Sequence, residues 1–373
     1  MINKPKLFAQ FQEEDILQEF GRLLFSLINA FSANGYQISF YDNISKENLG
    51  KYGQLIYYLD NFSLTDVPPN NTEDSVYLFD KEIKALGKLP WRKKIQVNFD
   101  IFSPYWFKSP IIMPYPMHPS HVTIDLKERL KKLRSSEKNI GVFFSGDTKG
   151  YVRNRVHYPK AKLPRLEIVN SILDRMGENV QHVEDLSVLN NQKDTSYIQK
   201  CVIIDTSKCW VNEKHWLGYL ARANFFLSPP GIVMPMCHNI VEAMSVGAIP
   251  ITNYPEWFDP MLTHMKDCIV FDDKDDLIEN LKLALRMDKS QVEKMRDNTI
   301  AYYQNFLNPD NFVNRIESHK DKEITVLLIT ENYMAKKYSK LNKNSILIRG
   351  TISNSNKAWF EELYDYVFHS SSD

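Results

Sequence analysis

The sequence predicts an α/β protein built from two Rossmann-like domains that face a central cleft. Two observations predict this fold class. The chain has 373 residues, enough for two domains of roughly 100–200 residues each. Short apolar runs typical of buried parallel strands alternate with segments of helical periodicity. We place the first domain at 1–130, the second at 131–310, and at 311–373 a C-terminal extension that packs back on the first domain.

The first domain begins with a strand, a helix and a second strand. Lys6–Phe11 reads as a strand, and apolar residues then recur at helical spacing between Ile16 and Phe31. Asn34-Gly35 is a typical helix end, and Tyr36–Tyr41 is the next strand. Such a unit favours a parallel sheet. Further strands are expected at Leu55–Leu59, Val76–Phe79, Ile95–Phe99 and Ile111–Met113, followed by a charged helix at Asp125–Glu137.

The second domain opens with Ile140–Phe144, a continuous apolar run typical of a strand buried on both faces. Strands and helices then alternate, as in a doubly wound sheet. The strands are expected at Val202–Asp205, Asn224–Leu227, Ala248–Thr252 and Cys268–Phe271, and the helices at Leu166–Met176, His215–Ala223, Asn239–Val246 and Asp275–Met287. The extension is expected to carry strands at Ile324–Thr330 and Ile346–Arg349 and a helix at Lys357–Phe368.

Composition argues against several classes of partner and location. Lys plus Arg and Asp plus Glu both total 46, so the formal net charge is zero and no nucleic-acid partner is expected. No apolar stretch approaches the roughly 20 residues of a transmembrane helix, although peripheral membrane contact is left open. The four cysteines are low in density and read as reduced thiols of a cytoplasmic protein. No zinc-type spacing occurs, so neither a metal nor another cofactor is expected.

The segment Asn224–Ile251 carries the strongest chemical signal. A buried strand is followed by a loop containing Pro230-Gly231 and by a helix that begins near His238 and Asn239. A helix that begins at the carboxyl edge of a parallel sheet points its unpaired N–H groups into the cleft, which makes a site suited to a diphosphate. Glu242 lies about one turn in, where its carboxylate could reach the hydroxyls of a ribose. An ordinary loop and a surface helix would give the same spacing.

This segment resembles the C-terminal half of exostosin-type glycosyltransferases and, more loosely, of GT-B glycosyltransferases. The shared pattern is a strand, a Pro-x-Gly loop, a Glu-Ala pair, a glycine and a strand of the Ile-Pro-Val type. Two further blocks of the family pattern lie upstream. The first is a strand followed by a proline, and the second is a strand and a glycine loop followed by basic residues. In this sequence the blocks are Ile111–Tyr115, Val142–Gly146 with Arg153 and Arg155, Phe225–Leu227, Pro229–Gly231, Glu242-Ala243, Gly247 and Ile249–Ile251.

The resemblance implies transfer of a sugar from a nucleotide-sugar, UDP- or GDP-linked, to a carbohydrate acceptor, in surface polysaccharide or glycan synthesis. It implies a hexosyltransferase-like enzyme of EC class 2.4 that is inverting and needs no metal. The donor would lie on the second domain and the acceptor on the first. The donor-binding residues implied are Ser145, Gly146, Arg153, Arg155, Pro230, Gly231, His238, Asn239 and Glu242.

An inverting transfer needs a base that takes the proton of the acceptor hydroxyl. The candidates at predicted strand ends and in the Pro-rich crossover are Glu13, Asp60, Asp100 and His118. Aromatic residues that could stack on a sugar are Trp210, Trp216, Tyr254 and Trp257, of which Trp257 follows a strand at its cleft end. Core packing is the competing interpretation of these rings.

The sequence departs from the family pattern at three positions. Ile232 stands where Asp is frequent, Met234 where many retaining enzymes have a second Glu, and Asn239 where Arg is frequent. These substitutions leave open a degenerate module that binds glycans or a partner enzyme without catalysis. A sugar-nucleotide epimerase also stays open, because the GT-B fold hosts such enzymes too.

Overall fold

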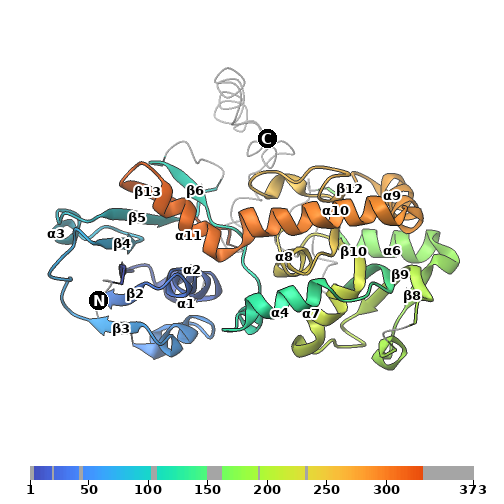
Figure 1. Cartoon of the computed structure of the whole chain (residues 1–373), viewed down its shortest axis with the longest axis horizontal. Coiled ribbons are helices and arrows are strands. Elements are labelled where there is room, and N and C mark those ends of the chain that lie inside the picture. The colour runs from blue at the N-terminus through green and yellow to red at the C-terminus, as the bar shows by residue number, and fades with distance from the viewer. Residues whose placement is uncertain are drawn as a thin grey trace, which may run out of the picture.

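The computed structural model describes residues 4–18, 21–41, 45–101, 107–148, 162–191, 194–231 and 234–330. The chain forms two parallel-sheet domains that lie side by side (Figure 1). The architecture predicted from the sequence, an α/β fold of two Rossmann-like domains, is confirmed. Among the described residues, no helix combines the length and apolar character needed to cross a membrane.

The first sheet has the strand order β3-β2-β1-β4-β5-β13-β6, with every neighbouring pair parallel. Its six early strands follow the order of a Rossmann sheet, and a strand from the end of the described chain is inserted between β5 and β6. The strands are β1 (Lys6–Gln10), β2 (Gln37–Tyr41), β3 (Phe62–Thr65), β4 (Ser75–Phe79), β5 (Lys93–Asn98), β6 (Pro110–Ile112) and β13 (Glu323–Leu327).

The two faces of the first sheet are covered unequally. Leu7, Ile38 and Val326 point to the face packed by α2 (Gly21–Ala33) and α11 (Pro309–Ser318). Alternate residues such as Phe8 and Tyr77 point to the other face, where α3 (Lys84–Gly87) and a few aromatic rings cover them. The interior side of α2 is almost wholly apolar, which is why this helix packs against the sheet along most of its length.

The second sheet has the order β12-β11-β10-β7-β9-β8 and is also parallel throughout. Its strands are β7 (Ile140–Gly146), β8 (Val180–His182), β9 (Tyr197–Asp205), β10 (Ala223–Ser228), β11 (Ile249–Thr252) and β12 (Ile269–Val270). Helices α6 (Arg165–Arg175) and α9 (Lys274–Arg286) cover one face, and α7 (Glu213–Arg222) and α8 (His238–Ser245) cover the other.

The described chain passes between the two domains at two places. The first is the extended segment Met113–Val122, which leads into α4 (Leu126–Arg134). The second is the run from α10 (Lys289–Tyr302) through a π-helical turn at Tyr303–Leu307 into α11, visible as one long band in Figure 1. Pro309 at the first turn of α11 restarts the helix after that turn. The largest hydrophobic cluster includes residues of both domains, such as Leu327 and Trp257.

Most predicted elements lie within a few residues of the observed ones, but Leu55–Leu59 is a correction. This run was predicted as a strand, and it belongs to the 3₁₀ helix Gly53–Tyr58 that packs on α2. The strand of this region is β3, which starts at Phe62. A short apolar run fits either element, and the close approach of Gly53 to α2 decides the outcome here. The strand Ile346–Arg349 and helix Lys357–Phe368 predicted in the extension lie outside the described residues.

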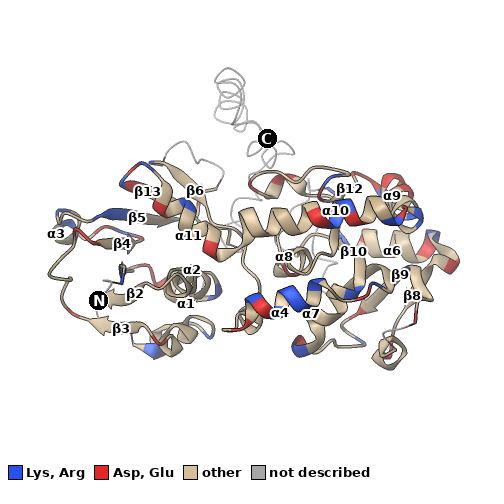
Figure 2. Cartoon of the chain, in the orientation of Figure 1, with Lys and Arg blue, Asp and Glu red and all other residues tan. Residues whose placement is uncertain are grey.

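Charged residues mark the outward surfaces of the helices. Figure 2 shows both signs of charge along α4, α9 and α10, whereas α2 is nearly uncharged. Arg22 is the single charged residue in α2.

Candidate functional site

A cavity of about 460 Å³ lies where the two domains meet. The first domain contributes Arg22 and Tyr52, and the crossover segment contributes His118 and His121. The second domain contributes the carboxyl ends of its strands and the beginning of α8, the usual place for a ligand in a doubly wound sheet. These second-domain residues are Ser145, Gly146, Asp147, Arg165, Thr206, Trp210, Val211, Glu213, Trp216, Cys237, His238, Asn239 and Glu242.

The N-terminus of α8 opens into this cavity. Its first residues, Cys237, His238 and Asn239, line the wall. The N-cap residue Cys237 has extended backbone angles, and its side chain makes no capping hydrogen bond. The first N–H groups of a helix have no partner within the helix and carry the positive end of its dipole. This end of α8 is therefore an electropositive part of the cavity wall.

A tight turn shapes the loop before α8. A Cβ atom placed on Gly231 would lie 2.5 Å from the carbonyl oxygen of Met234, so only glycine fits where the chain folds back on itself. Pro230 and Gly231 were predicted to bind the donor, yet neither is among the described residues that line the cavity. In this structure Gly231 shapes the loop that leads to α8.

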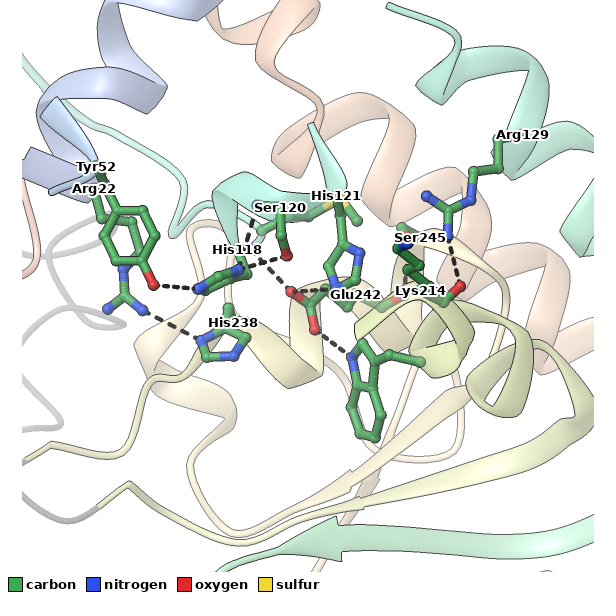
Figure 3. A network of polar contacts seen from close by, with 12 residues as sticks. Arg22, Tyr52, His118, Ser120, His121, Arg129, Lys214, His238, Glu242 and Ser245 are labelled. Atoms are coloured by element: carbon green, nitrogen blue, oxygen red, sulfur yellow. Dashed lines mark hydrogen bonds and ion pairs between the residues drawn. The ribbon is translucent and has the colours of Figure 1, made fainter. Parts of the chain in front are cut away.

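Arg22 reaches from the first domain to the beginning of α8. One of its guanidinium nitrogens donates to the hydroxyl of Tyr115 at 2.9 Å, and another lies 3.4 Å from Nδ1 of His238 (Figure 3). Burial, together with the nearby positive charge of Arg22, lowers the pKa of His238 to about 3. His238 is therefore neutral at pH 7, and its Nδ1 can accept the hydrogen bond from Arg22.

Arg165, at the start of α6, adds a second guanidinium to the wall. It is buried beneath the strand–Gly loop, where its side chain donates to the carbonyl oxygen of Asp147 at 3.3 Å. A Cβ atom on Gly146 would lie 3.1 Å from this guanidinium, so the glycine allows the close approach. Ser145 and Gly146, both predicted to bind the donor, line the cavity at this point. Arg153 and Arg155, predicted for the same role, lie outside the described residues.

His118 is held by both domains. Its Nε2 lies 2.9 Å from the hydroxyl of Tyr52, and its Nδ1 lies 2.7 Å from the hydroxyl of Ser120. Its backbone N–H donates to the carboxylate of Glu242 at 2.9 Å. The ring also lies near that of His238, with 5.2 Å between the centroids (Figure 3). Burial lowers the pKa of His118, which keeps the imidazole largely neutral at pH 7.

Glu242 lines the cavity, and its side chain is fully buried. Its Oε1 accepts the N–H of His118, and its Oε2 accepts the indole N–H of Trp216 at 2.5 Å. His121 lies next to it, with 3.9 Å between Nε2 and Oε1. Burial raises the pKa of the Glu242 carboxyl to about 7, and the two N–H donors oppose that rise. The sequence analysis predicted that this carboxylate reaches a ribose. In the structure both of its oxygens accept N–H groups of the protein, and its side chain is 0% exposed.

Of the four predicted bases, only His118 is among the described residues that line the cavity. Glu13 forms an ion pair with Lys81 at 2.7 Å. Asp60 is exposed on the surface after the 3₁₀ helix. The backbone N–H of Asp100 donates to the side chain of Asn98 in the turn after β5. The structure therefore singles out His118 from this set.

Some of the predicted aromatic residues line the cavity, and others lie in the hydrophobic core. Trp257, which the sequence analysis singled out, is 2% exposed and belongs to the core. Trp210 is 67% exposed and lines the cavity. Trp216 also borders the cavity, but its indole N–H is used by Glu242. Trp210 is therefore the ring that a ligand could stack on.

Sequence reasoning missed Arg22, Tyr52 and His121. Arg22 carries a signal in hindsight, because it is the only charge in a helix that is otherwise almost apolar. Tyr52 and His121 carry none that we recognise, since their place beside α8 depends on how the domains pack. Among the described residues, no three His, Cys, Asp or Glu side chains are grouped so that they could hold a metal ion.

No protein-family model and no curated protein matches the chain. Three solved structures illustrate its remote similarities. An alpha-glucosyltransferase in complex with UDP is 14% identical, with 84% of this chain and 99% of that chain covered and a TM-score of 0.39. HepE from Anabaena in complex with UDP is 10% identical, with coverages of 84% and 98% and a TM-score of 0.44. A glycosyltransferase from Rickettsia africae is 7% identical, with coverages of 84% and 97% and a TM-score of 0.46.

Similarity at this level is too low to carry an activity from those proteins to this one. The resemblance to exostosin-type enzymes stays a prediction, since none of the names above mentions that type. Two parallel-sheet domains with a cavity between them, as predicted for a GT-B fold, are what the topology of this chain itself shows.

Proposed function

We propose that this chain is a glycosyltransferase that moves a sugar from a nucleoside-diphosphate donor, UDP- or GDP-linked, to a carbohydrate acceptor. The observation that carries the proposal is the beginning of α8, which opens without a side-chain cap into the interdomain cavity. In this proposal residues 131–310 bind the donor and residues 1–130 the acceptor, and the extension at 311–373 supports the first domain.

The charge around α8 suits a diphosphate. The helix N-terminus attracts anions, and Arg22 and Arg165 both line the same cavity. Guanidinium groups can bind phosphate oxygens through two parallel hydrogen bonds. When the bond between the sugar and the diphosphate breaks, negative charge grows on the departing phosphate oxygen, and these groups stabilise it. We propose that they make a bound metal unnecessary.

His118 is the base in the proposed reaction. The acceptor hydroxyl attacks the anomeric carbon, the bond to the diphosphate breaks, and the hydroxyl proton moves to His118 Nε2. In the required tautomer, Nδ1–H donates to Ser120 Oγ, and Nε2 accepts from Tyr52 until the acceptor takes that place. The 3.3 Å hydrogen bond that Nδ1 accepts from the backbone N–H of Ser120 in this structure is given up in that tautomer. A single attack of this kind inverts the anomeric centre. Met234, 1% exposed and packed in the core, supports inversion, since it replaces the second glutamate of many retaining enzymes.

The biological setting that we propose is surface polysaccharide or glycan synthesis, and it rests on the composition described in the sequence analysis alone. Hexosyl transfer, EC class 2.4, is the corresponding reaction class.

The first test is a thermal-shift screen of the purified chain with UDP, GDP, CMP and their sugars. A ligand that binds only the folded state raises the melting temperature. We expect UDP or GDP and the matching sugars to raise it, and CMP to leave it unchanged. Arg165→Gln, which removes a cation beside α8, should reduce the shift, whereas the exposed Arg175→Gln on the same helix should not.

Product analysis then separates the open alternatives. Incubating the donor that binds with a panel of sugar acceptors should give a glycosylated product and a free nucleoside diphosphate, in the presence of EDTA as well as without it. Epimerised donor without acceptor would identify the epimerase instead. A chain that binds no nucleotide at all would be the degenerate module.

A further inference from the structure

Glu242 joins three parts of the molecule that are far apart in sequence. The residue belongs to α8 in the second domain, and its two oxygens accept one N–H each, from the crossover segment at His118 and from α7 at Trp216. Its side chain is 0% exposed, and Figure 3 shows it close to His118 and His121. A carboxylate can accept both bonds at once because it has two equivalent oxygens.

His118 is correspondingly tied to both domains. Its backbone is held by Glu242 of the second domain, and its ring is held by Tyr52 of the first. Tyr52 lies in the segment that packs against the start of α2, where a Cβ atom on Gly21 would be 2.7 Å from the nitrogen of Gly53. That close packing fixes Tyr52 relative to α2. The position of the His118 ring is therefore set from two sides.

We propose that Glu242 is a positioning residue, which fixes His118 at the junction of the two domains and does not bind the ribose of a donor. The anchoring role stands on the two hydrogen bonds alone. The consequence for catalysis rests on the function proposed above, because it requires His118 to be the base. Misplacing a catalytic group by about 1 Å can lower the rate about a hundredfold.

A double-mutant cycle tests the anchor without any activity assay. In Glu242→Gln the new amide cannot accept from both N–H donors, so one of them is left unsatisfied and the melting temperature falls. In Trp216→Phe the indole donor is gone, and the amide of a glutamine at 242 can turn its N–H₂ toward that side. We therefore expect Glu242→Gln to cost clearly less in the Trp216→Phe background than in the wild type. If the effects of Glu242→Gln and Trp216→Phe on the melting temperature are additive, the anchoring role of Glu242 is wrong.

The positioning of His118 is read directly from its ring. NMR titration of the histidine side chains should show changed His118 signals in Glu242→Gln and loss of the contact with Tyr52. Glu279→Gln, an exposed acid on α9, serves as the control and should change neither. Unchanged His118 signals in a folded Glu242→Gln would overturn the positioning role, whatever the activity of the chain.

Two further readouts separate this inference from the proposed function. In an active wild type, Glu242→Gln should lower kcat about a hundredfold with a smaller change in KM, since the donor contacts remain. Binding of UDP and 2′-deoxy-UDP distinguishes the ribose contact. If the wild type prefers UDP and Glu242→Gln loses that preference, Glu242 binds the ribose and our inference is wrong. A wild type without transferase activity would contradict the proposed function. The double-mutant cycle and the NMR titration would then still test whether Glu242 anchors His118.

Discussion

At the scale of single residues, Arg22 is the clearest example of a side chain whose surroundings and role are set by the tertiary fold. Its sequence neighbours form the apolar face of α2, yet its guanidinium lies beside His238 at the positive end of α8. Positive charge is normally unfavourable there. An anion between the two would reverse the sign of that interaction, as expected if the cavity takes a diphosphate.

We predict that Arg22→Gln weakens binding of UDP or GDP by about 10- to 100-fold, the range expected for a lost hydrogen bond to a charged group. Binding of uridine or guanosine, which lack phosphates, should be unchanged. Isothermal titration calorimetry measures both. Arg129→Gln on α4, whose side chain is not among the described cavity residues, is the matched control. Equal losses for nucleoside and nucleotide would show that Arg22 supports the fold and does not contact phosphate.

Trp210 gives a second prediction at this scale. Its exposed ring at the cavity rim is expected to stack on the base or the sugar of a bound donor. Removal of the ring in Trp210→Ala should weaken binding about 10-fold, since a stacking contact contributes roughly 1–3 kcal/mol. Trp210→Phe should retain most of the affinity. Tryptophan fluorescence, followed while the ligand is titrated in, tests this contact. If the ligand stacks on Trp210, the quenching seen in the wild type should be lost in both variants. Quenching that persists unchanged would place the ligand elsewhere.

At the scale of elements, β13 shows how the end of the described chain completes the first domain. It lies between β5 and β6 and pairs with both in parallel register. Val326 points from it into the core against α2 and α11 and is fully buried. The first sheet is therefore not complete until residues near 327 have been synthesised.

We predict that Val326→Asp destabilises the first domain by more than about 3 kcal/mol, because it buries an unpaired charge in the middle of the sheet. Urea unfolding followed by circular dichroism should show a lower midpoint. Glu323→Gln, at the partly exposed start of the same strand, should unfold close to the wild type. A small effect of Val326→Asp would mean that β13 is dispensable for the sheet.

The elements that the sequence predicted well are those whose periodicity is strong. Ile140–Phe144 and Asn224–Leu227 lie on central strands buried on both faces, and they read as continuous apolar runs for that reason. Leu55–Leu59 was misread because a five-residue apolar run fits a strand or a helical turn equally well. The insertion of β13 beside β5 could not be predicted, since pairing between segments about 230 positions apart leaves no local pattern.

The same distinction applies to the site. The strand–loop–helix pattern from Asn224 predicted the beginning of α8 and its exposure to the cavity. It could not predict that the acidic residue of that helix would turn to Trp216 and the backbone of His118, because both partners come from other elements. Local spacing locates a helix end, whereas partner choice in the interior depends on tertiary packing.

At the scale of the whole molecule, the buried ionisable groups at the domain junction contribute to the dependence of folding stability on pH. Burial lowers the pKa of His121 from 6.5 to about 4 and that of His238 to about 3, and it lowers that of His118. Between pH 6.5 and about 4 the unfolded chain therefore binds more protons than the folded chain. The free energy of unfolding thus decreases as the pH is lowered. Glu242, with its pKa raised to about 7, has the opposite effect between pH 4.5 and 7.

We predict that the three histidines outweigh the single glutamate, so that the melting temperature falls as the pH is lowered from 6.5 to 4. His121→Gln should make that fall shallower, because it removes one group that the unfolded state protonates. Differential scanning calorimetry across this range measures the slope, and a melting temperature that rises on acidification would contradict the prediction.

The two passages of the described chain between the domains, at Met113–Val122 and through the π-helical turn at Tyr303–Leu307, limit how the domains can move. Because the described chain crosses between the domains at two places, we expect their relative motion to be mainly a rotation about the line that joins these places. Arg22 and Tyr52 would then move together relative to α8, whereas His118 lies in one of the two passages and stays bonded to Glu242 of α8. One rotation would then both admit a ligand and bring together the groups that act on it. A single distance between labels on α3 and α9 would measure that rotation.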